Sequence, residues 1–259
     1  METLKLTPDS LPLSEKIRIA IERIREFEPP DGYHAAFSGG KDSQTYLELA
    51  KMAGVMFDAH FNFTTVDPPE LLRFIRDNYP DVQWDRPKRT MWQLIVSNGP
   101  PDRRFRFCCR ALKERGGKGR FVLTGVRKEE STKRANRRMV EICYQDNTRR
   151  FLHPIIDWRE RDVWEFIRER SLKYCELYDQ GFDRIGCVGC PMAGRKRIMQ
   201  FERWPGYKKA YLKAFGELID RRLECGGNLT WQTPEEVMEW WLRDRKEKAD
   251  PDQLMIFSD

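Results

Sequence analysis

Four cysteines are the residues of this chain whose types and spacing most directly suggest chemistry. They form an adjacent pair, Cys108 and Cys109, and a later pair separated by two residues, Cys187 and Cys190. Thiolate sulfur is a soft ligand, so four thiolates in pairs suit a zinc ion or an iron–sulfur cluster. Neighbouring helical residues point about 100° apart. The adjacent pair therefore favours a cluster with separated irons, while zinc and plain buried thiols stay open.

A glycine-rich loop with a lysine lies upstream of the cysteines. Its sequence is Ser38-Gly39-Gly40-Lys41-Asp42-Ser43. Residues 33–37 predict a short strand before it and residues 42–52 a helix after it, an arrangement that points backbone N–H groups at an anion. The glycines allow close backbone approach, and Lys41 supplies a point charge. Asp42 suits a magnesium ion or a helix cap. A plain Gly-Gly turn is the alternative.

This loop is not one of the two commonest nucleotide loops. Ala35 and Asp42 occupy positions where a Walker A motif needs Gly and Ser or Thr. No GxGxxG sequence follows a predicted strand, which excludes a dinucleotide fingerprint.

Strands alternate with helices through the first two thirds of the chain. This alternation predicts an α/β fold, a doubly wound, mostly parallel sheet, with ligands beyond the carboxyl ends of its strands, where the loop falls. From about residue 171 the pattern becomes helical, rich in tryptophan and basic. We therefore expect a nucleotide-binding domain over residues 1–170 and a helical region that completes the cysteine site over 171–259, with a soft boundary between them and a single domain as the alternative. The other expected strands are 55–63, 82–84, 121–125, 139–144 and 150–153, the last two as a hairpin.

Composition limits the class of protein. The chain has 259 residues, 40% of them hydrophobic, and a net charge of +6 that permits a polyanionic partner without requiring one. The sequence contains no run of 18 apolar residues, so it predicts no membrane span. The N-terminus lacks the pattern of a secretory signal. Seven cysteines, two pairs at metal spacing, predict a reducing, cytoplasmic location.

Several motifs together resemble one family. SGGKDS resembles the PP-loop of ATP pyrophosphatases, and FRFCCRALK with GCVGCP is similar to the cluster motif of adenylylsulfate reductases. Residues 125–134 resemble the G-x-R-x-x-E-S-x-x-R substrate segment, and residues 154–164 the P-I-x-x-W…DVW segment. On these motifs the chain is identified as a member of the phosphoadenylylsulfate (PAPS) reductase family, within the PP-loop superfamily.

The resemblance implies specific sites. ATP with Mg²⁺ would bind at Ser38, Gly39, Gly40, Lys41, Asp42 and Ser43, with Lys41 and Asp42 also catalytic. A 4Fe–4S cluster would be held by Cys108, Cys109, Cys187 and Cys190. An anionic substrate group would be bound by Arg127, Glu130, Ser131 and Arg134. The alternative for the arginines is that they are solvated loop charges.

The complete loop implies the thiolation branch of the family. There the enzyme cleaves ATP to AMP and pyrophosphate and activates an acceptor, here expected to be nucleic acid, for sulfur supplied by a cysteine desulfurase. A second hypothesis is thioredoxin-dependent reduction of an adenylylsulfate to sulfite, with Cys225 as nucleophile. No histidine follows Cys225 as in the reductases, so a glycine-capped helix end is its alternative. A third is a non-catalytic, cluster-bearing nucleotide sensor. A homodimer is an open alternative to a monomer.

Overall fold

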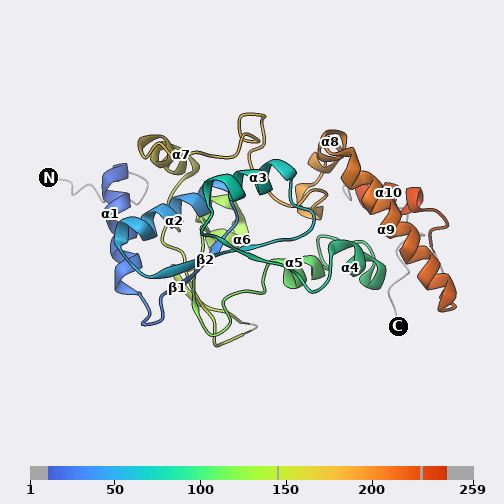
Figure 1. Cartoon of the computed structure of the whole chain (residues 1–259), viewed down its shortest axis with the longest axis horizontal. Helices are drawn as coiled ribbons and strands as arrows, with labels where there is room; N and C mark the ends of the chain where they lie inside the picture. Colours follow the sequence, from blue (N-terminus) through green and yellow to red (C-terminus); the bar gives the residue numbers. More distant parts are fainter. Residues whose placement is uncertain (1–10, 145, 228–229, 244–259) are drawn as a thin grey trace. The chain divides into compact units, whose positions relative to one another are not determined.

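The protein is described from a computed structural model covering residues 11–144, 146–227 and 230–243 (Figure 1). It divides into two compact units. The first, the α/β unit, contains the described residues up to Phe63, together with Pro68–Arg86 and Lys113–Ile185. The second, the helical unit, contains Thr64–Asp67, Pro87–Leu112 and the described residues from Gly186 onward.

A six-stranded sheet forms the centre of the α/β unit. Its order is β3-β2-β1-β4-β6-β5. Parallel pairings join the strands from β3 to β6, and β5 pairs antiparallel with β6, which confirms the mostly parallel sheet and the hairpin expected from the sequence. The strands are β1 (Tyr33–Phe37), β2 (Phe57–Asn62), β3 (Gln83–Asp85), β4 (Phe121–Leu123), β5 (Val140–Ile142) and β6 (Arg150–Leu152).

Helices pack around this sheet and on one another. Tyr33 in β1 is buried, and its hydroxyl donates to the Ile24 carbonyl at 2.8 Å, which ties α1 to the sheet. The buried Lys16–Asp162 ion pair joins α1 to α7. Pro69 begins α3, where its missing N–H costs no helical hydrogen bond. The helices are α1 (Leu13–Glu26), α2 (Lys41–Ala53), α3 (Pro69–Asn78), α6 (Thr132–Ala135) and α7 (Glu160–Glu169), with a 3-10 turn, η2 (Lys128–Glu130).

The strand order reverses beside β1. Strands β2 and β3 lie on one side of β1, whereas β4 lies on the other. In open α/β sheets, ligands bind beyond the carboxyl ends of the strands at such a switch point. The segments that leave this edge here are residues 38–43 after β1 and residues 124–127 after β4.

The helical unit has an aromatic core of its own. Tyr211, Phe215 and Trp241 pack together, and the Trp241 Nε1 donates to the Pro101 carbonyl at 2.6 Å. A capping box between Thr90 and Gln93 begins α4. The helices are α4 (Met91–Asn98), α5 (Phe107–Leu112), α8 (Lys196–Arg203), α9 (Pro205–Glu224) and α10 (Pro234–Leu242), with a 3-10 turn, η3 (Pro191–Ala193).

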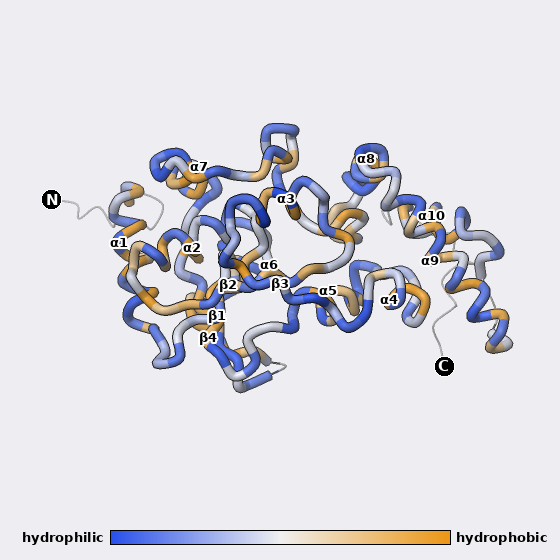
Figure 2. The backbone as a smooth tube through the Cα atoms, viewed as in Figure 1, coloured by the Kyte–Doolittle hydropathy of each residue, from blue (hydrophilic) through white to orange (hydrophobic). Residues whose placement is uncertain are grey.

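The division of the chain differs from a single boundary near residue 170. The α/β unit continues to Ile185, and residues 87–112, between β3 and β4, pack with α9 in the helical unit. Apolar and polar residues alternate along the helices (Figure 2), and none of the described helices is long and apolar enough to cross a bilayer.

Candidate active site

Hydroxyl and backbone groups hold the loop after β1 in one shape. The Ser43 hydroxyl donates to the Gly40 carbonyl at 2.8 Å and accepts from the Ser38 hydroxyl at 3.1 Å and the Ser38 N–H at 3.3 Å. The Gly40 N–H donates to the Ser38 hydroxyl at 3.4 Å. The two serines therefore close the loop around the N-terminus of α2, where the first N–H groups lack helical partners.

Gly39 is required by both conformation and packing. Its φ of +70° lies in the left-handed region. A Cβ at this position would lie 2.7 Å from Leu71 Cδ1 and 2.8 Å from Ile75 Cδ1. Helix α3 therefore packs directly against the loop backbone.

Lys41 lies inside the site rather than in solvent. It is 5% exposed, and its Nζ lies 3.4 Å from Asp42 Oδ2 and 3.6 Å from Glu160 Oε1. Its N–H donates to the Tyr178 hydroxyl at 2.9 Å. The first amide of α2 is thus satisfied by a side-chain hydroxyl of the protein, which fixes the start of the helix against residue 178.

The loop after β4 locks onto the start of α2. A Cβ on Gly125 would lie 2.8 Å from the Asp42 carbonyl carbon and oxygen, so only glycine fits there. Arg127 is 2% exposed; its Nε donates to Asp42 Oδ1 at 2.6 Å and its Nη1 to Glu129 Oε2 at 3.0 Å. Burial opposes the charge of Arg127, but Asp42, Glu130 and Glu129 together outweigh it, so the pKa of Arg127 is raised.

The other predicted substrate residues lie beside Arg127 in sequence and in space. Glu130 accepts from the Arg127 N–H at 2.9 Å and forms an ion pair with Arg134. The Ser131 hydroxyl caps α6 by accepting from the Arg134 N–H at 3.3 Å. Both arginines have carboxylate partners from the protein, and their role in binding an anionic substrate stays a prediction.

Three further residues contact the loops at this edge of the α/β unit: His153, Glu160 and Tyr178. His153, directly after β6, is fully buried, with Nδ1 2.6 Å from the Thr124 hydroxyl oxygen. Burial, and then the charge of Arg137, lowers the pKa of His153 to about 4. Glu160 falls within the motif region 154–164, and His153 is the last residue of the predicted strand 150–153. No motif in the sequence indicated a role for Tyr178.

The CxxC segment forms a turn fixed by its backbone within the helical unit. The Cys190 N–H donates to the Cys187 carbonyl at 3.3 Å. Between them, the Val188 N–H donates to the Val66 carbonyl at 2.7 Å, and the Val188 carbonyl accepts from the Tyr211 hydroxyl at 2.9 Å. These bonds fix the backbone of the turn to residues 66 and 211 of the same unit.

All four predicted cluster ligands belong to the helical unit, with the adjacent pair in α5. The hydrogen-bonded Cys109 and burial raise the pKa of Cys108, and Cys187 and Cys190 raise it further. The four sulfurs are thus close enough for their charges to interact. None of the chain's seven cysteines forms a disulfide.

The spacing of these thiols can be compared with that of a single metal site. A tetrahedral zinc with bonds of about 2.3 Å spaces its sulfurs about 3.8 Å apart. Among the described residues, three potential ligand atoms within 4.8 Å of one another occur only at His34, Asp58 and His60, so the cysteines are more widely spread.

Cys225 lies at the end of α9 and is exposed. The Gly226 N–H donates to the Leu223 carbonyl at 3.0 Å and the Gly227 N–H to the Arg222 carbonyl at 2.9 Å. These two bonds form a Schellman motif, the glycine-capped helix end offered as the alternative for this position. A catalytic role for Cys225 stays a prediction.

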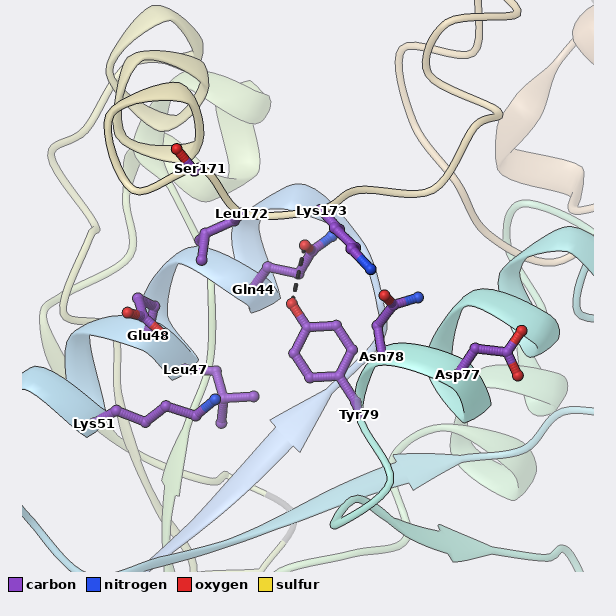
Figure 3. Close-up of a pocket in the computed structure, with 10 residues that line it drawn as sticks. All are labelled: Gln44, Leu47, Glu48, Lys51, Asp77, Asn78, Tyr79, Ser171, Leu172 and Lys173. Atoms are coloured by element: carbon purple, nitrogen blue, oxygen red, sulfur yellow. Dashed lines mark hydrogen bonds between the residues drawn. The ribbon is translucent and has the colours of Figure 1, made fainter.

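A polar cavity of about 410 Å³ lies on the outer side of α2 (Figure 3). It meets the loop only through Gln44, whose Nε2 donates to the Gly39 carbonyl at 3.1 Å and whose Oε1 accepts from the Tyr79 hydroxyl at 3.0 Å. Gln44 therefore supports the loop, and none of residues 38–43 lines the cavity, so the cavity is not the loop's anion site. Its lining residues are Gln44, Leu47, Glu48, Lys51, Asp77, Asn78, Tyr79, Ser171, Leu172 and Lys173.

The sequence is similar to several known proteins. An uncharacterized protein of Methanocaldococcus jannaschii is 30% identical over 201 residues, which cover 72% of this chain and 46% of the relative. The chain spans less than half the length of two such archaeal relatives. The adenosine 5′-phosphosulfate reductase of Shouchella clausii is 29% identical over 204 residues, covering 67% of this chain and 77% of the enzyme.

One solved structure supports the fold. The phosphoadenylyl-sulfate (PAPS) reductase of Candida auris, in its phosphate complex, matches with a TM-score of 0.51 and 19% identity over 71% of this chain and 97% of that chain. The profile of the phosphoadenosine phosphosulfate reductase domain matches residues 33–193, more than half of the chain. That match spans the glycine loop, the Arg127 segment and all four paired cysteines, and the chain belongs to the phosphoadenosine phosphosulfate reductase family.

Proposed function

We propose that this protein binds ATP with Mg²⁺ at Ser38–Ser43 and cleaves it to AMP and pyrophosphate, activating an acceptor for sulfur insertion. The observation that carries the proposal is the placement of Lys41. It is buried at the N-terminus of α2, at the switch point of the sheet, beside the carboxylates of Asp42 and Glu160. A lysine and a carboxylate together suit a magnesium–phosphate substrate.

The chemistry has two steps. An acceptor oxygen forms a bond to the α-phosphorus of ATP as the bond to the bridging oxygen breaks, and pyrophosphate leaves. Sulfur at the hydrosulfide level then bonds to the acceptor as the acceptor's bond to the AMP oxygen breaks. Loop amides and Lys41 would stabilise charge on the leaving pyrophosphate, so positioning and electrostatics account for most of the catalysis.

The acceptor and the sulfur source follow from the same proposal. A net charge of +6 is compatible with a nucleic-acid acceptor, and a cysteine desulfurase with a thiol reductant would supply the sulfur. The proposed site of action is the cytoplasm, where thiolates stay reduced.

Cys108, Cys109, Cys187 and Cys190 would hold a 4Fe–4S cluster. Such a cluster, when bound, keeps its thiolate ligands ionised and adds a redox-active centre to the helical unit. The placement of all four cysteines in the helical unit supports this assignment, as does the effect of Cys109, Cys187 and Cys190, which raise the pKa of the Cys108 thiol.

A second candidate is thiol-dependent reduction of an adenylylsulfate to sulfite. It is favoured by the 26–29% identity to enzymes named adenosine 5′-phosphosulfate reductase. Cys225, exposed at the end of α9, would attack sulfur in that reaction, with thioredoxin as reductant.

One assay separates the two. Anaerobic protein is incubated with Mg·ATP and total cellular RNA or DNA, with sulfide as sulfur source, and AMP and pyrophosphate are measured. A parallel sample receives adenylylsulfates and thioredoxin, and sulfite is measured. Pyrophosphate release that Lys41→Ala abolishes supports sulfur insertion, whereas sulfite formation that Cys225→Ser abolishes supports reduction. If neither product forms although ATP binds, the result supports the nucleotide-sensor hypothesis.

A further inference from the structure

One face of the parallel sheet carries a row of polar side chains. Parallel sheets are normally covered on both faces and read as apolar runs. Here β1 presents His34, and β2 presents Asp58, His60 and Asn62 on the face opposite Tyr33 and Phe37, because alternate residues share a face. Two histidines and a carboxylate on a sheet face therefore need an explanation beyond packing.

The three residues bring ligand atoms together. His60 Nε2 lies 2.5 Å from Asp58 Oδ2, and His34 Nδ1 lies 3.7 Å from the same oxygen. The two imidazoles stack with centroids 4.3 Å apart. One ligand atom from each residue lies within 4.8 Å of the others. His34 is 5% exposed and Asp58 is about one third exposed, so the group is anchored inside and open on one side.

His60 lies between two carboxylates. Its Nδ1 is 3.0 Å from Asp85 Oδ2, while its Nε2 faces Asp58. A neutral imidazole has a single N–H and can donate to one of them only. If Nδ1 donates to Asp85, the Nε2 lone pair faces an anionic oxygen, which is repulsive unless a second proton or a metal cation lies between. Carboxylate–histidine–metal is the usual arrangement around zinc-bound histidine, with Asp85 as the orienting carboxylate.

The surroundings fix the orientation of the Asp58 carboxylate and of His34, and a buried amide oxygen, that of Asn62, lies on the same strand as Asp58 and His60. Arg120 donates to the other Asp58 oxygen, Oδ1, at 2.6 Å, which orients Oδ2 toward the imidazoles. The Asn62 Oδ1 is buried without a hydrogen-bond partner among the described residues. The 113–120 segment covers His34, because a Cβ on Gly116 would lie 2.6 Å from its Nε2. Only Nδ1 of His34 is therefore directed at Asp58.

We propose that His34, Asp58 and His60 form a binding site for a divalent transition-metal cation, with zinc as the best match. Two imidazoles and one carboxylate are the ligand types that zinc prefers over magnesium. Tetrahedral zinc spaces nitrogen and oxygen ligands about 3.4 Å apart, so the His34 contact already fits and the His60 contact opens by about 1 Å. The site joins β1 to β2, and through Asp85 to β3, and its role is structural. It is independent of the four paired cysteines, which belong to the helical unit.

The three histidines of the chain make the test direct. Holo-protein labelled with ¹⁵N-histidine gives three imidazole spin systems by NMR, assigned with His34→Gln, His60→Gln and His153→Gln. One equivalent of Zn²⁺ is expected to shift the His34 and His60 nitrogens and leave His153 unmoved, while Mg²⁺ shifts none. Zinc captured by thiols would not produce this pattern, so the cysteines do not confound it.

Thermal unfolding gives a second measurement that needs no NMR assignment. Zinc is expected to raise the Tm of the wild-type protein, and His60→Gln or Asp58→Asn should remove most of that increase; Cys225→Ser, which changes an exposed thiol, should keep it. The proposal is overturned if all three histidines are unmoved in excess zinc. It is also overturned if the Tm increase is the same in the wild-type and His60→Gln proteins.

Discussion

Arg127 Nε donates to Asp42 Oδ1 at 2.6 Å, and this bond joins the loop after β4 to the first turn of α2. The two residues are 85 positions apart in the chain and meet at the edge of the sheet where the strand order reverses. The Asp42 carboxylate of the glycine loop is thus positioned by a buried guanidinium. Its orientation depends on the segment after β4 as much as on the glycine loop itself.

Replacing Arg127 with Met should leave Asp42 without its buried partner. Removing one member of a buried ion pair costs about 3 kcal/mol of unfolding free energy. Arg134→Gln is the control, because Arg134 is one third exposed and its pair with Glu130 is worth at most about 1 kcal/mol. Urea denaturation of both variants measures the difference, and equal losses would contradict the buried role of Arg127.

Gly39→Ala should be more damaging than Gly54→Ala, although both glycines have a φ of +70°. A Cβ on Gly54 meets nothing within 4 Å, so that variant reports the conformational cost alone, about 1 kcal/mol. Gly39→Ala adds the clash with Leu71 and Ile75, for a total of about 2–4 kcal/mol, and should also weaken ATP binding. Unfolding free energy and nucleotide affinity are the measurements. Identical behaviour of the two variants would mean that α3 yields to the added methyl.

The sequence was sufficient for the parallel sheet and for the position of the loop, because both follow from local patterns. Strand 33–37 and the glycine loop after it are encoded by adjacent residues. The position of residues 87–112 in the helical unit could not be read in this way, since α4 within this segment packs against α9, which begins more than a hundred residues after α4 ends.

Lys41→Ala should reduce pyrophosphate release about 10²-fold or more, because it removes a preorganised positive charge that would stabilise the leaving pyrophosphate. The fold and any cysteine-bound cofactor should be retained, since the four ligands belong to the other unit. Lys51→Ala, an exposed lysine near the end of the same helix, is the matched control. A Lys41 variant that lost visible absorption as well would show that the two sites are coupled.

Acid should destabilise the protein partly through His153. Its pKa falls from the ordinary 6.5 to about 4 in the folded state, so the folded protein binds fewer protons than the unfolded chain between these values. The unfolding free energy therefore falls as the pH drops from about 6.5 to about 4, by at most about 3 kcal/mol from this residue. His153→Gln should flatten that slope while leaving the profile above pH 7 unchanged in shape. An identical slope in both proteins would exclude His153 as a source.

Cys187→Ser should remove visible absorption and bound iron from anaerobically purified protein, because it removes one of four thiolates. Cys143→Ser is the control: Cys143 is a buried cysteine of the α/β unit that accepts from Arg149 at 3.3 Å. That variant should keep its iron. Full iron content in the Cys187 variant would remove this residue from the ligand set.

The partners of the predicted residues were beyond the reach of sequence reasoning. Lys41 was expected to face a phosphate, yet its neighbours Glu160 and Asp183 come from segments far along the chain. The resemblance placed Arg127 and Arg134 in a substrate segment, but their carboxylate partners depend on side-chain geometry. The His34–Asp58–His60 group was missed because its members lie on two strands at no motif spacing.

Residues 87–112 belong to the helical unit, while the chain before and after them builds the α/β unit. During synthesis, Cys108 and Cys109 emerge about 80 residues before Cys187, which at 5–20 residues per second is a delay of roughly 4–16 s. Throughout that delay the nascent chain carries an adjacent dithiol without the turn that completes its set. Any cofactor needing all four sulfurs must therefore be loaded late, and the early pair must be kept from oxidation or from stray metals until then.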